Sequence, residues 1–155
     1  MISNKIKGGI LGNINIPSDK SISHRSIIIP SISMGISEIN NLLMSDDVLH
    51  TLNAFKTLGV KIEKLNKKII IYGKGLNSLK KPNKNIYLGN SGTSARLLTG
   101  LLSSQTFETI LEGDHSLSSR PMARIMDPLK LMGAKFENVS GTLPLKIIGK
   151  KLNKS

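Results

Sequence analysis

The first candidate for chemistry is the segment 17–25, in which cations and hydroxyls follow the end of a predicted strand. It reads PSDKSISHR and places Lys20, Ser21 and Arg25 in the opening turns of a predicted helix. The unpaired N–H groups and the dipole of a helix N-terminus attract phosphate and carboxylate. The segment therefore predicts an anion pocket. A Ser/Asp helix cap followed by solvated cations is the alternative.

A second segment of this kind, residues 88–96, again joins a predicted strand to a predicted helix. It reads LGNSGTSAR, in which Gly89 and Gly92 let the backbone approach a ligand closely and Arg96 supplies a cation. The spacing fits neither the P-loop nor the dinucleotide G-x-G-x-x-G, so a nucleotide motif is excluded. A glycine-containing turn with no ligand is the alternative.

The third segment, residues 113–124, reads GDHSLSSRPMAR. Pro121 suits the first turn of a helix, where its missing N–H costs nothing, and this places Arg120 at the helix start. Arg124 is predicted either to share the face of Arg120 or to form a surface ion pair with Asp127 or Asp114. At the matching place in the first half, the sequence SDD at 45–47 favours helix capping and dipole compensation.

The lysines and the arginines are distributed differently along the chain. The chain has 22 basic and 10 acidic residues, a net charge of +12, which predicts attraction to an anion. Its 18 Lys are scattered through surface-like stretches, whereas its four Arg all lie in the segments just described. Arg is the planar, bidentate donor that suits carboxylate and phosphate. The three His show no metal-ligand spacing, so no metal site is predicted, and helix-start hydrogen bonding or simple exposure is expected of them.

An internal repeat must position these segments. The pattern TLNAFKTLGVKI at 51–62 matches IMDPLKLMGAKF at 125–136, and in each a helix is predicted to end at a Gly. The first half is predicted to have strands at 10–16, 37–43, 61–65 and 69–72 and helices at 20–33 and from 46. The second is predicted to have strands at 85–88, 107–111, 135–139 and 145–148, with helices at 93–104 and from about 118.

The fold class predicted from this order is α/β (α+β), with two tandem β-α-β-α-β-β units. The first unit is expected over residues 1–76, a linker over 77–83, the second unit over 84–150 and a basic tail over 151–155. Two such units leave apolar faces that need neighbours, so further units or a complementary chain are expected.

The composition sets the class of protein. Hydrophobic residues make up 39% and aromatic residues 3% of the 155 residues, which indicates a globular protein with an aliphatic core. The absence of Cys excludes disulfides, zinc–thiolate sites and cysteine nucleophiles, and suits a reducing compartment. No apolar run approaches the roughly 20 residues that cross a bilayer, and the first residues lack a signal-peptide core. A soluble, cytoplasmic protein is expected.

Taken together, the three segments resemble, in order and spacing, the motifs of the 5-enolpyruvylshikimate-3-phosphate synthase family, the 3-phosphoshikimate 1-carboxyvinyltransferases. The resemblance covers nearly the whole chain. It implies the enolpyruvate transferase fold, an inside-out α/β barrel of six units in two domains, of which this chain has two units. It also implies that the leading segment pairs with the second domain. The related enzymes that act on a UDP-sugar usually carry a catalytic Cys, which this chain lacks.

By this resemblance, Lys20, Ser21 and Arg25 bind shikimate-3-phosphate, and Lys20, Gly92, Arg96 and Arg120 bind phosphoenolpyruvate. The implied reaction transfers an enolpyruvyl group from phosphoenolpyruvate to the 5-hydroxyl of shikimate-3-phosphate, with no metal or organic cofactor. The acid and base residues of the family match nothing before Ser155, so an N-terminal part that is inactive alone is expected. A small basic nucleic-acid-binding module is the alternative, although two Tyr, three Phe and no Trp offer few stacking platforms.

Overall fold

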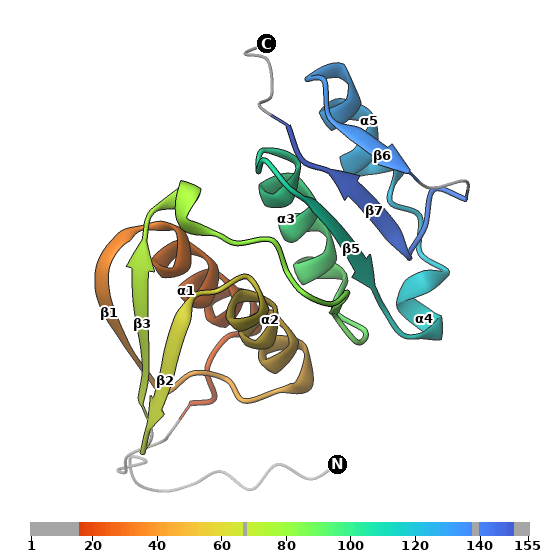
Figure 1. Cartoon of the computed structure of the whole chain (residues 1–155). Coiled ribbons are helices and arrows are strands. Elements are labelled where there is room, and N and C mark those ends of the chain that lie inside the picture. The colour runs from red at the N-terminus through yellow and green to blue at the C-terminus, as the bar shows by residue number, and fades with distance from the viewer. Residues whose placement is uncertain (1–15, 67, 138–139, 151–155) are drawn as a thin grey trace, which may run out of the picture.

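The computed structural model describes residues 16–66, 68–137 and 140–150, which form two sheet-and-helix layers lying side by side (Figure 1). In the first layer, α1 (Lys20–Ile32) and α2 (Asp46–Thr57) pack on an antiparallel sheet. Its strands are β1 (Met34–Asn40), β2 (Lys61–Leu65) and β3 (Lys68–Lys74), in the order β1-β3-β2. A short 3-10 helix, η1 (Leu76–Ser78), follows.

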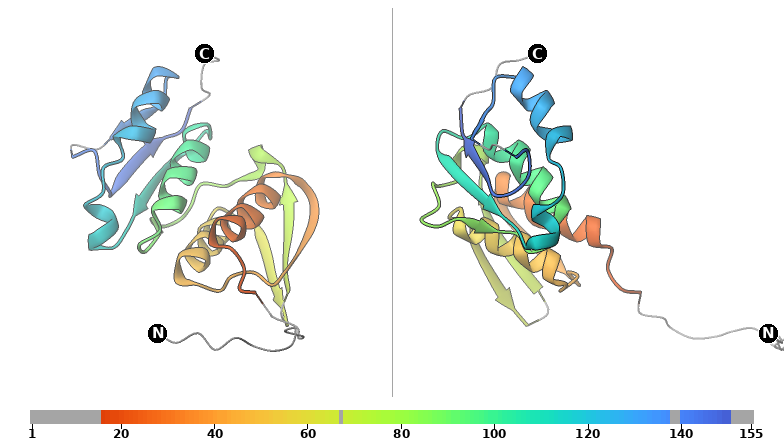
Figure 2. Two further views of the ribbon diagram at one scale, coloured as in Figure 1. Left: turned by 180° about the vertical axis from the view of Figure 1, so that it is seen from behind. Right: turned by 90° about the vertical axis from the view of Figure 1, so that its right-hand side faces the viewer.

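The second layer has four strands and three helices. Its sheet has the order β4-β5-β7-β6, with β4 (Ile86–Tyr87) parallel to β5 (Glu108–Glu112), and with β7 (Leu145–Ile148) antiparallel to β5 and to β6 (Lys135–Glu137). The helices are α3 (Gly92–Ser103), α4 (His115–Ser118) and α5 (Ala123–Leu131). Seen from behind, the longer helices of both layers lie in front of their sheets (Figure 2, left), so one side of the molecule is helical.

Alternation of side chains explains how α1 is seated on its sheet. In β3, Ile69 and Ile71 are buried and point to the helical side. Gly73 continues this inward face, and a Cβ there would collide with the carbonyl oxygens of Pro30 and Ser33 at the end of α1. The missing side chain lets the end of α1 approach the strand closely.

A single aliphatic core joins the two layers. Buried residues of both layers belong to one cluster, and α2 packs against α3 and β4. Phe55 on α2 is completely buried, as are Leu88 after β4 and Leu98 on α3. The two helix starts that carry the candidate residues are thus attached to one core.

Much of the predicted order is confirmed. The strands at 61–65 and 145–148 have the predicted bounds, and α1 and α3 begin within one residue of the prediction. Gly59 and Gly133 follow α2 and α5 with φ of 87° and 94°, the left-handed conformation expected of a helix stop. The predicted strand at 10–16 lies outside the described residues except for Ile16, which is not in a strand.

Two predicted boundaries are wrong. The strand placed at 37–43 runs from Met34 to Asn40, because α1 leads directly into it and Asn41, at φ 56°, ends it. The helix placed from about 118 is two helices. The Asp114 carboxylate caps α4 at the Leu117 N–H (2.7 Å), and Pro121 lies before α5 instead of in its first turn. Pro121 disfavours a helical backbone conformation at the residue before it, so α4 cannot continue through Arg120.

The predicted unit and linker boundaries stay predictions. The linker segment nonetheless lies against the first layer: the Lys80 N–H donates to the Leu58 carbonyl (2.9 Å), and Leu79 is buried. Among the described residues, none of the helices has the length and apolar character needed to span a membrane.

Candidate anion-binding site

The starts of α1 and α3 are built alike. The Asp19 carboxylate caps α1 by accepting from the Ile22 N–H (2.6 Å), and the Ser91 hydroxyl caps α3 by accepting from the Ser94 N–H (3.3 Å). Each cap satisfies one N–H of its helix and leaves others directed outward. Both helix starts therefore present positive potential to the solvent.

An open groove of about 370 Å³ lies between these two helix starts. Its lining residues come from both halves of the chain and include four of the predicted site residues; they are Ser21, Arg25, Gly92, Thr93, Arg96 and Leu97. None of them is acidic. The first and second segments therefore lie at one groove, a juxtaposition that neither segment alone specifies.

Gly92 is the point where two guanidinium groups meet. The Arg96 Nη1 donates to the Gly92 carbonyl (3.1 Å). A Cβ at Gly92 would lie 2.8 Å from Arg96 Nη1 and 3.2 Å from Arg120 Nη1. Arg120 thus reaches the start of α3 from the loop between α4 and α5, and the bare backbone of Gly92 makes space for both side chains.

Neutral groups hold Arg120 in place. Its Nη2 donates to the side-chain oxygen of Asn90 and to the Ser116 hydroxyl (3.2 Å). Within the described ranges, Arg25, Arg96 and Arg120 form no ion pair. Like charges this close repel, and an anion bound between them would offset the repulsion. Asn90 and Ser116 were missed from the sequence, since only the approach of the third segment to the second reveals them.

The Lys20 side chain, a predicted site residue, is paired with a carboxylate. Its ammonium forms an ion pair with the Asp47 carboxylate (2.9 Å) on α2, and it does not line the groove. To contact an anion there, Lys20 would first have to leave Asp47. The sequence SDD at 45–47 is predicted to provide helix capping and dipole compensation at the start of α2. Ser45 holds the cap position but makes no side-chain cap bond, whereas Asp46 and Asp47 lie in the first turn, where the helix dipole favours them.

The remaining candidate cation, Arg124, lies outside the groove. It is exposed on α5 and forms no ion pair with the described residues. Asp127 instead pairs with Lys130 (3.7 Å), and Asp114 caps α4, so both predicted partners are engaged elsewhere. Arg124 is therefore a useful control for charge effects.

The three histidines have separate surroundings. His24 is buried behind the groove and bonds to the Thr51 hydroxyl (2.8 Å), whereas His115 is exposed. His50 packs edge-on against Tyr87. Burial lowers the pKa of His24; nearby Lys20 acts in the same direction and Asp47 opposes it. His24 is thus held neutral at physiological pH. Thr51 was missed from the sequence, where nothing distinguishes it from other helical threonines.

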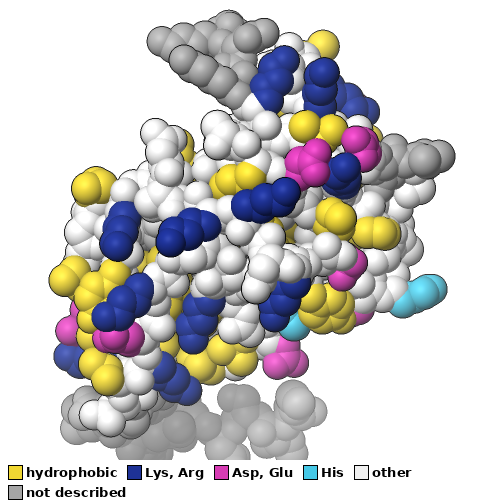
Figure 3. Space-filling model, viewed as in Figure 1, with side chains coloured by type: hydrophobic (Ala, Val, Ile, Leu, Met, Phe, Trp, Pro, Cys, Tyr) yellow, Lys and Arg dark blue, Asp and Glu magenta, His cyan; other side chains and the backbone are white. Residues whose placement is uncertain are grey.

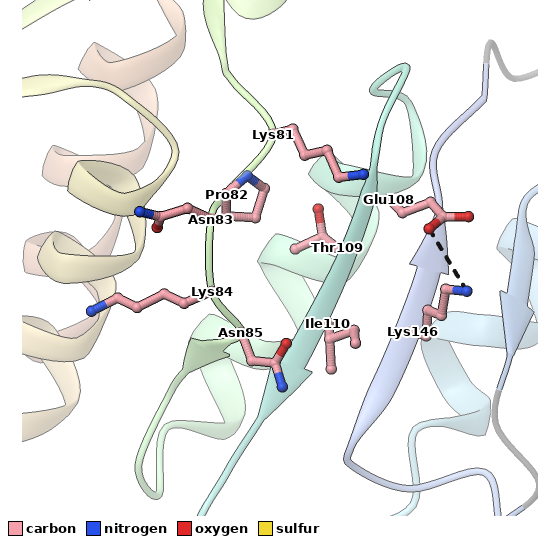
Figure 4. Close-up of a pocket in the computed structure, with 9 residues that line it drawn as sticks. All are labelled: Lys81, Pro82, Asn83, Lys84, Asn85, Glu108, Thr109, Ile110 and Lys146. Carbon is pink, nitrogen blue, oxygen red and sulfur yellow. Dashed lines mark ion pairs between the residues drawn. The ribbon is translucent and has the colours of Figure 1, made fainter.

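A second cavity, of about 160 Å³, lies between the segment 81–85 and β5 (Figure 4). Three lysines line it: Lys81, Lys84 and Lys146. The Lys146 ammonium, however, is paired with Glu108 (3.7 Å) and Glu137 (2.9 Å). Across the face seen in Figure 3, Lys and Arg side chains are interspersed with neutral and apolar surface. The arginine groove, with no carboxylate in its lining, is the better anion site.

The fold and the groove together define the class: an α/β protein of repeated sheet-and-helix units in which two helix starts bring guanidinium groups together. The family model for EPSP synthase (3-phosphoshikimate 1-carboxyvinyltransferase) matches residues 5–155. The chain belongs to the EPSP synthase family, which confirms the resemblance drawn from the three segments, and its fold is the enolpyruvate transferase fold.

Similar proteins include two curated bacterial 3-phosphoshikimate 1-carboxyvinyltransferases. The chain is 53% identical to that of Vesicomyosocius okutanii over 138 residues, and 52% identical to that of Oenococcus oeni over 142 residues. These matches cover 89% and 91% of this chain and 32% of each relative. An EPSP synthase structure from Acinetobacter baumannii matches with a TM-score of 0.86 and 46% identity, over 90% of this chain and 32% of that one. The chain thus spans about a third of the length of the relatives it matches.

Proposed function

We propose that this chain is the part of a 3-phosphoshikimate 1-carboxyvinyltransferase that holds the anionic groups of both substrates. The observation that carries the proposal is the groove lined by Arg25 of α1 and by Gly92 and Arg96 of α3, with Arg120 reaching the same glycine. Shikimate-3-phosphate and phosphoenolpyruvate are both polyanions. An enzyme that joins them must bring like charges together, and uncompensated guanidinium groups offset that repulsion.

The roles divide between the two helix starts. Ser21 and Arg25, on α1, are assigned to shikimate-3-phosphate, and Lys20 is assigned to both substrates after it leaves Asp47. Gly92 and Arg96, on α3, are assigned to phosphoenolpyruvate together with Arg120. No metal or organic cofactor is assigned.

In the proposed reaction, the 5-hydroxyl of shikimate-3-phosphate loses its proton as its oxygen bonds to C2 of phosphoenolpyruvate, while C3 gains a proton. The C2–O bond to phosphate then breaks as C3 loses a proton, which restores the double bond and releases phosphate. The arginines contribute by holding the carboxylate and phosphate so that the hydroxyl faces C2, and by stabilising the departing phosphate. The proton-transfer residues belong to the remaining units, which the whole enzyme or a complementary chain would supply. The cytoplasmic location stays a prediction.

The alternative of a nucleic-acid-binding module receives less support. Three of the four arginines, Arg25, Arg96 and Arg120, lie in or beside one groove, whereas the lysines are dispersed and several are paired with carboxylates. Binding of nucleic acid to dispersed lysines would depend steeply on salt concentration and would persist against small phosphorylated competitors. Retarded migration of labelled DNA or RNA that survives excess shikimate-3-phosphate would favour the alternative.

Calorimetric titration of the chain with shikimate-3-phosphate tests the proposal. We expect Arg25→Ala to weaken binding by about ten- to a hundredfold, since hydrogen bonds to charged groups contribute about 1.5–3 kcal/mol. Arg124→Ala removes the same charge from an exposed site outside the groove, so it should leave binding nearly unchanged. Equal effects of the two variants would mean that net charge, and not this groove, attracts the ligand.

A further inference from the structure

Behind the groove, four polar side chains form a buried network that crosses between helices. His24 Nδ1 lies 2.8 Å from the Thr51 hydroxyl oxygen, which lies 2.5 Å from that of Ser94. Ser94 in turn lies 2.6 Å from the hydroxyl oxygen of Ser91, the cap of α3. All four residues are at most 1% exposed. We call His24, Thr51, Ser91 and Ser94 the inter-helix network.

The network joins the two helix starts that line the groove. His24 precedes Arg25 on α1, and Ser94 lies between Gly92 and Arg96 on α3. Thr51, on α2, touches both helices and does not line the groove. A buried hydroxyl chain is directional and short-ranged, so it fixes the separation of the helices more narrowly than aliphatic contacts do.

Counting the hydrogens gives one arrangement in which each has an acceptor. Ser91 donates to Ser94, Ser94 to Thr51, and Thr51 to the Asp47 carbonyl (3.3 Å). His24 then donates its Nδ1–H to Thr51, and its Nε2 carries only a lone pair. The other tautomer would bury an Nε2–H, and Nε2 has no partner among the described residues. The protonated, cationic ring would also carry an Nε2–H that is buried without an acceptor. The network therefore requires neutral His24.

We propose that Thr51, with His24 and Ser94, is a positioning residue for the anion groove: the inter-helix network sets α1 against α3 so that Arg25 and Arg96 converge on one ligand. The inference rests on the proposed function for the identity of the ligand. The network itself does not touch the ligand, and it acts only by holding the two helix starts in register.

Matched threonine variants test this role. Thr51 and Thr99 are both completely buried, and each bonds to the carbonyl four residues earlier, but only Thr51 also bonds to other helices. Thr51→Val should weaken binding of shikimate-3-phosphate about three- to tenfold, the effect of one net hydrogen bond. Thr99→Val should lower the melting temperature and leave affinity unchanged. Thr51→Ser, which restores the hydroxyl without the methyl, should recover affinity, and Ser94→Ala should repeat the loss.

A distance measurement separates this proposal from the proposed function. The chain contains no Cys, so spin labels can be attached at Ile29→Cys on α1, an exposed position, and at Gly100→Cys on α3, where a Cβ meets nothing within 4 Å. We expect Thr51→Val to broaden or shift the label distance and Thr99→Val to leave it unchanged. Unchanged distances in Thr51→Val, wild-type affinity in that variant, or equal affinity losses in both valine variants overturn the positioning role. If the unmodified chain binds no shikimate-3-phosphate, the proposed function fails, and the distances alone decide the positioning role.

Discussion

The starts of α1 and α3 bring cations to the same region but hold them differently. At α1 the Lys20 ammonium is paired with the Asp47 carboxylate, 2.9 Å away. At α3 Arg96 donates to a backbone carbonyl, and Arg120 donates to an amide and a hydroxyl. A neutral acceptor orients a guanidinium and leaves its charge uncompensated. A carboxylate orients a cation and also neutralises its charge. The α3 side is therefore arranged for an anion, while the α1 side offers Arg25 at once and Lys20 only after an ion pair opens.

The largest effect should come from filling the space beside the α3 arginines. A methyl at Gly92 would lie 2.8 Å from Arg96 Nη1 and 3.2 Å from Arg120 Nη1. We expect Gly92→Ala to displace both groups and to weaken phosphoenolpyruvate binding about tenfold or more, since charged hydrogen bonds of about 1.5–3 kcal/mol are affected. Calorimetric titration measures this.

Gly100 provides the control on the same helix. A Cβ there meets nothing within 4 Å. Gly100→Ala should leave affinity unchanged and raise the free energy of unfolding by about 0.5–1 kcal/mol, because alanine favours a helix interior. Unaltered affinity in Gly92→Ala would show that the α3 arginines do not carry the binding.

A smaller effect should come from releasing Lys20. Asp47→Asn removes its partner carboxylate, so we expect anion affinity to rise about two- to fivefold, in line with exposed ion pairs of about 0.2–1 kcal/mol. Asp46→Asn removes the same charge from the same helical turn without touching Lys20 and should raise affinity less. Equal gains would mean that Lys20 stays out of the site and that only net charge has changed. Titrations at low salt give the clearest comparison.

The smallest effect concerns pH and the network between the two helix starts. Burial lowers the pKa of His24 in the folded chain, so the unfolded chain binds more protons just below the ordinary pKa of about 6.5. The stability that neutral His24 contributes is complete above that value and is lost as pH falls toward the folded pKa. Thermal unfolding between pH 7.5 and 5.5 should show a falling melting temperature, and His24→Asn should flatten the slope. His115 is exposed, so His115→Asn should leave the slope unchanged. Equal slopes in the unmodified chain, His24→Asn and His115→Asn would contradict a neutral His24.

Local features were predicted well because they depend on near neighbours in the chain. The strands at 61–65 and 145–148 follow from short segments with apolar residues that are bounded by polar or glycine-containing turns. Gly59 and Gly133 end helices because only glycine adopts a positive φ without steric cost. The boundary near Ser118 was misjudged, because an aspartate cap and a proline compete for the same short segment.

The sequence by itself determined which helix starts carry cations, hydroxyls and glycines, since motif spacing and the preferences of helix termini are properties of short segments. Only the tertiary structure decided which of these groups meet. Arg96 and Arg120 converge on Gly92, Lys20 turns to Asp47, and His24 finds Thr51 and Ser94. Apart from the contact of Arg96 with Gly92 in its own helix, these pairings join segments that the common aliphatic core brings together, and hydrogen bonds and ion pairs act over distances that only such packing sets.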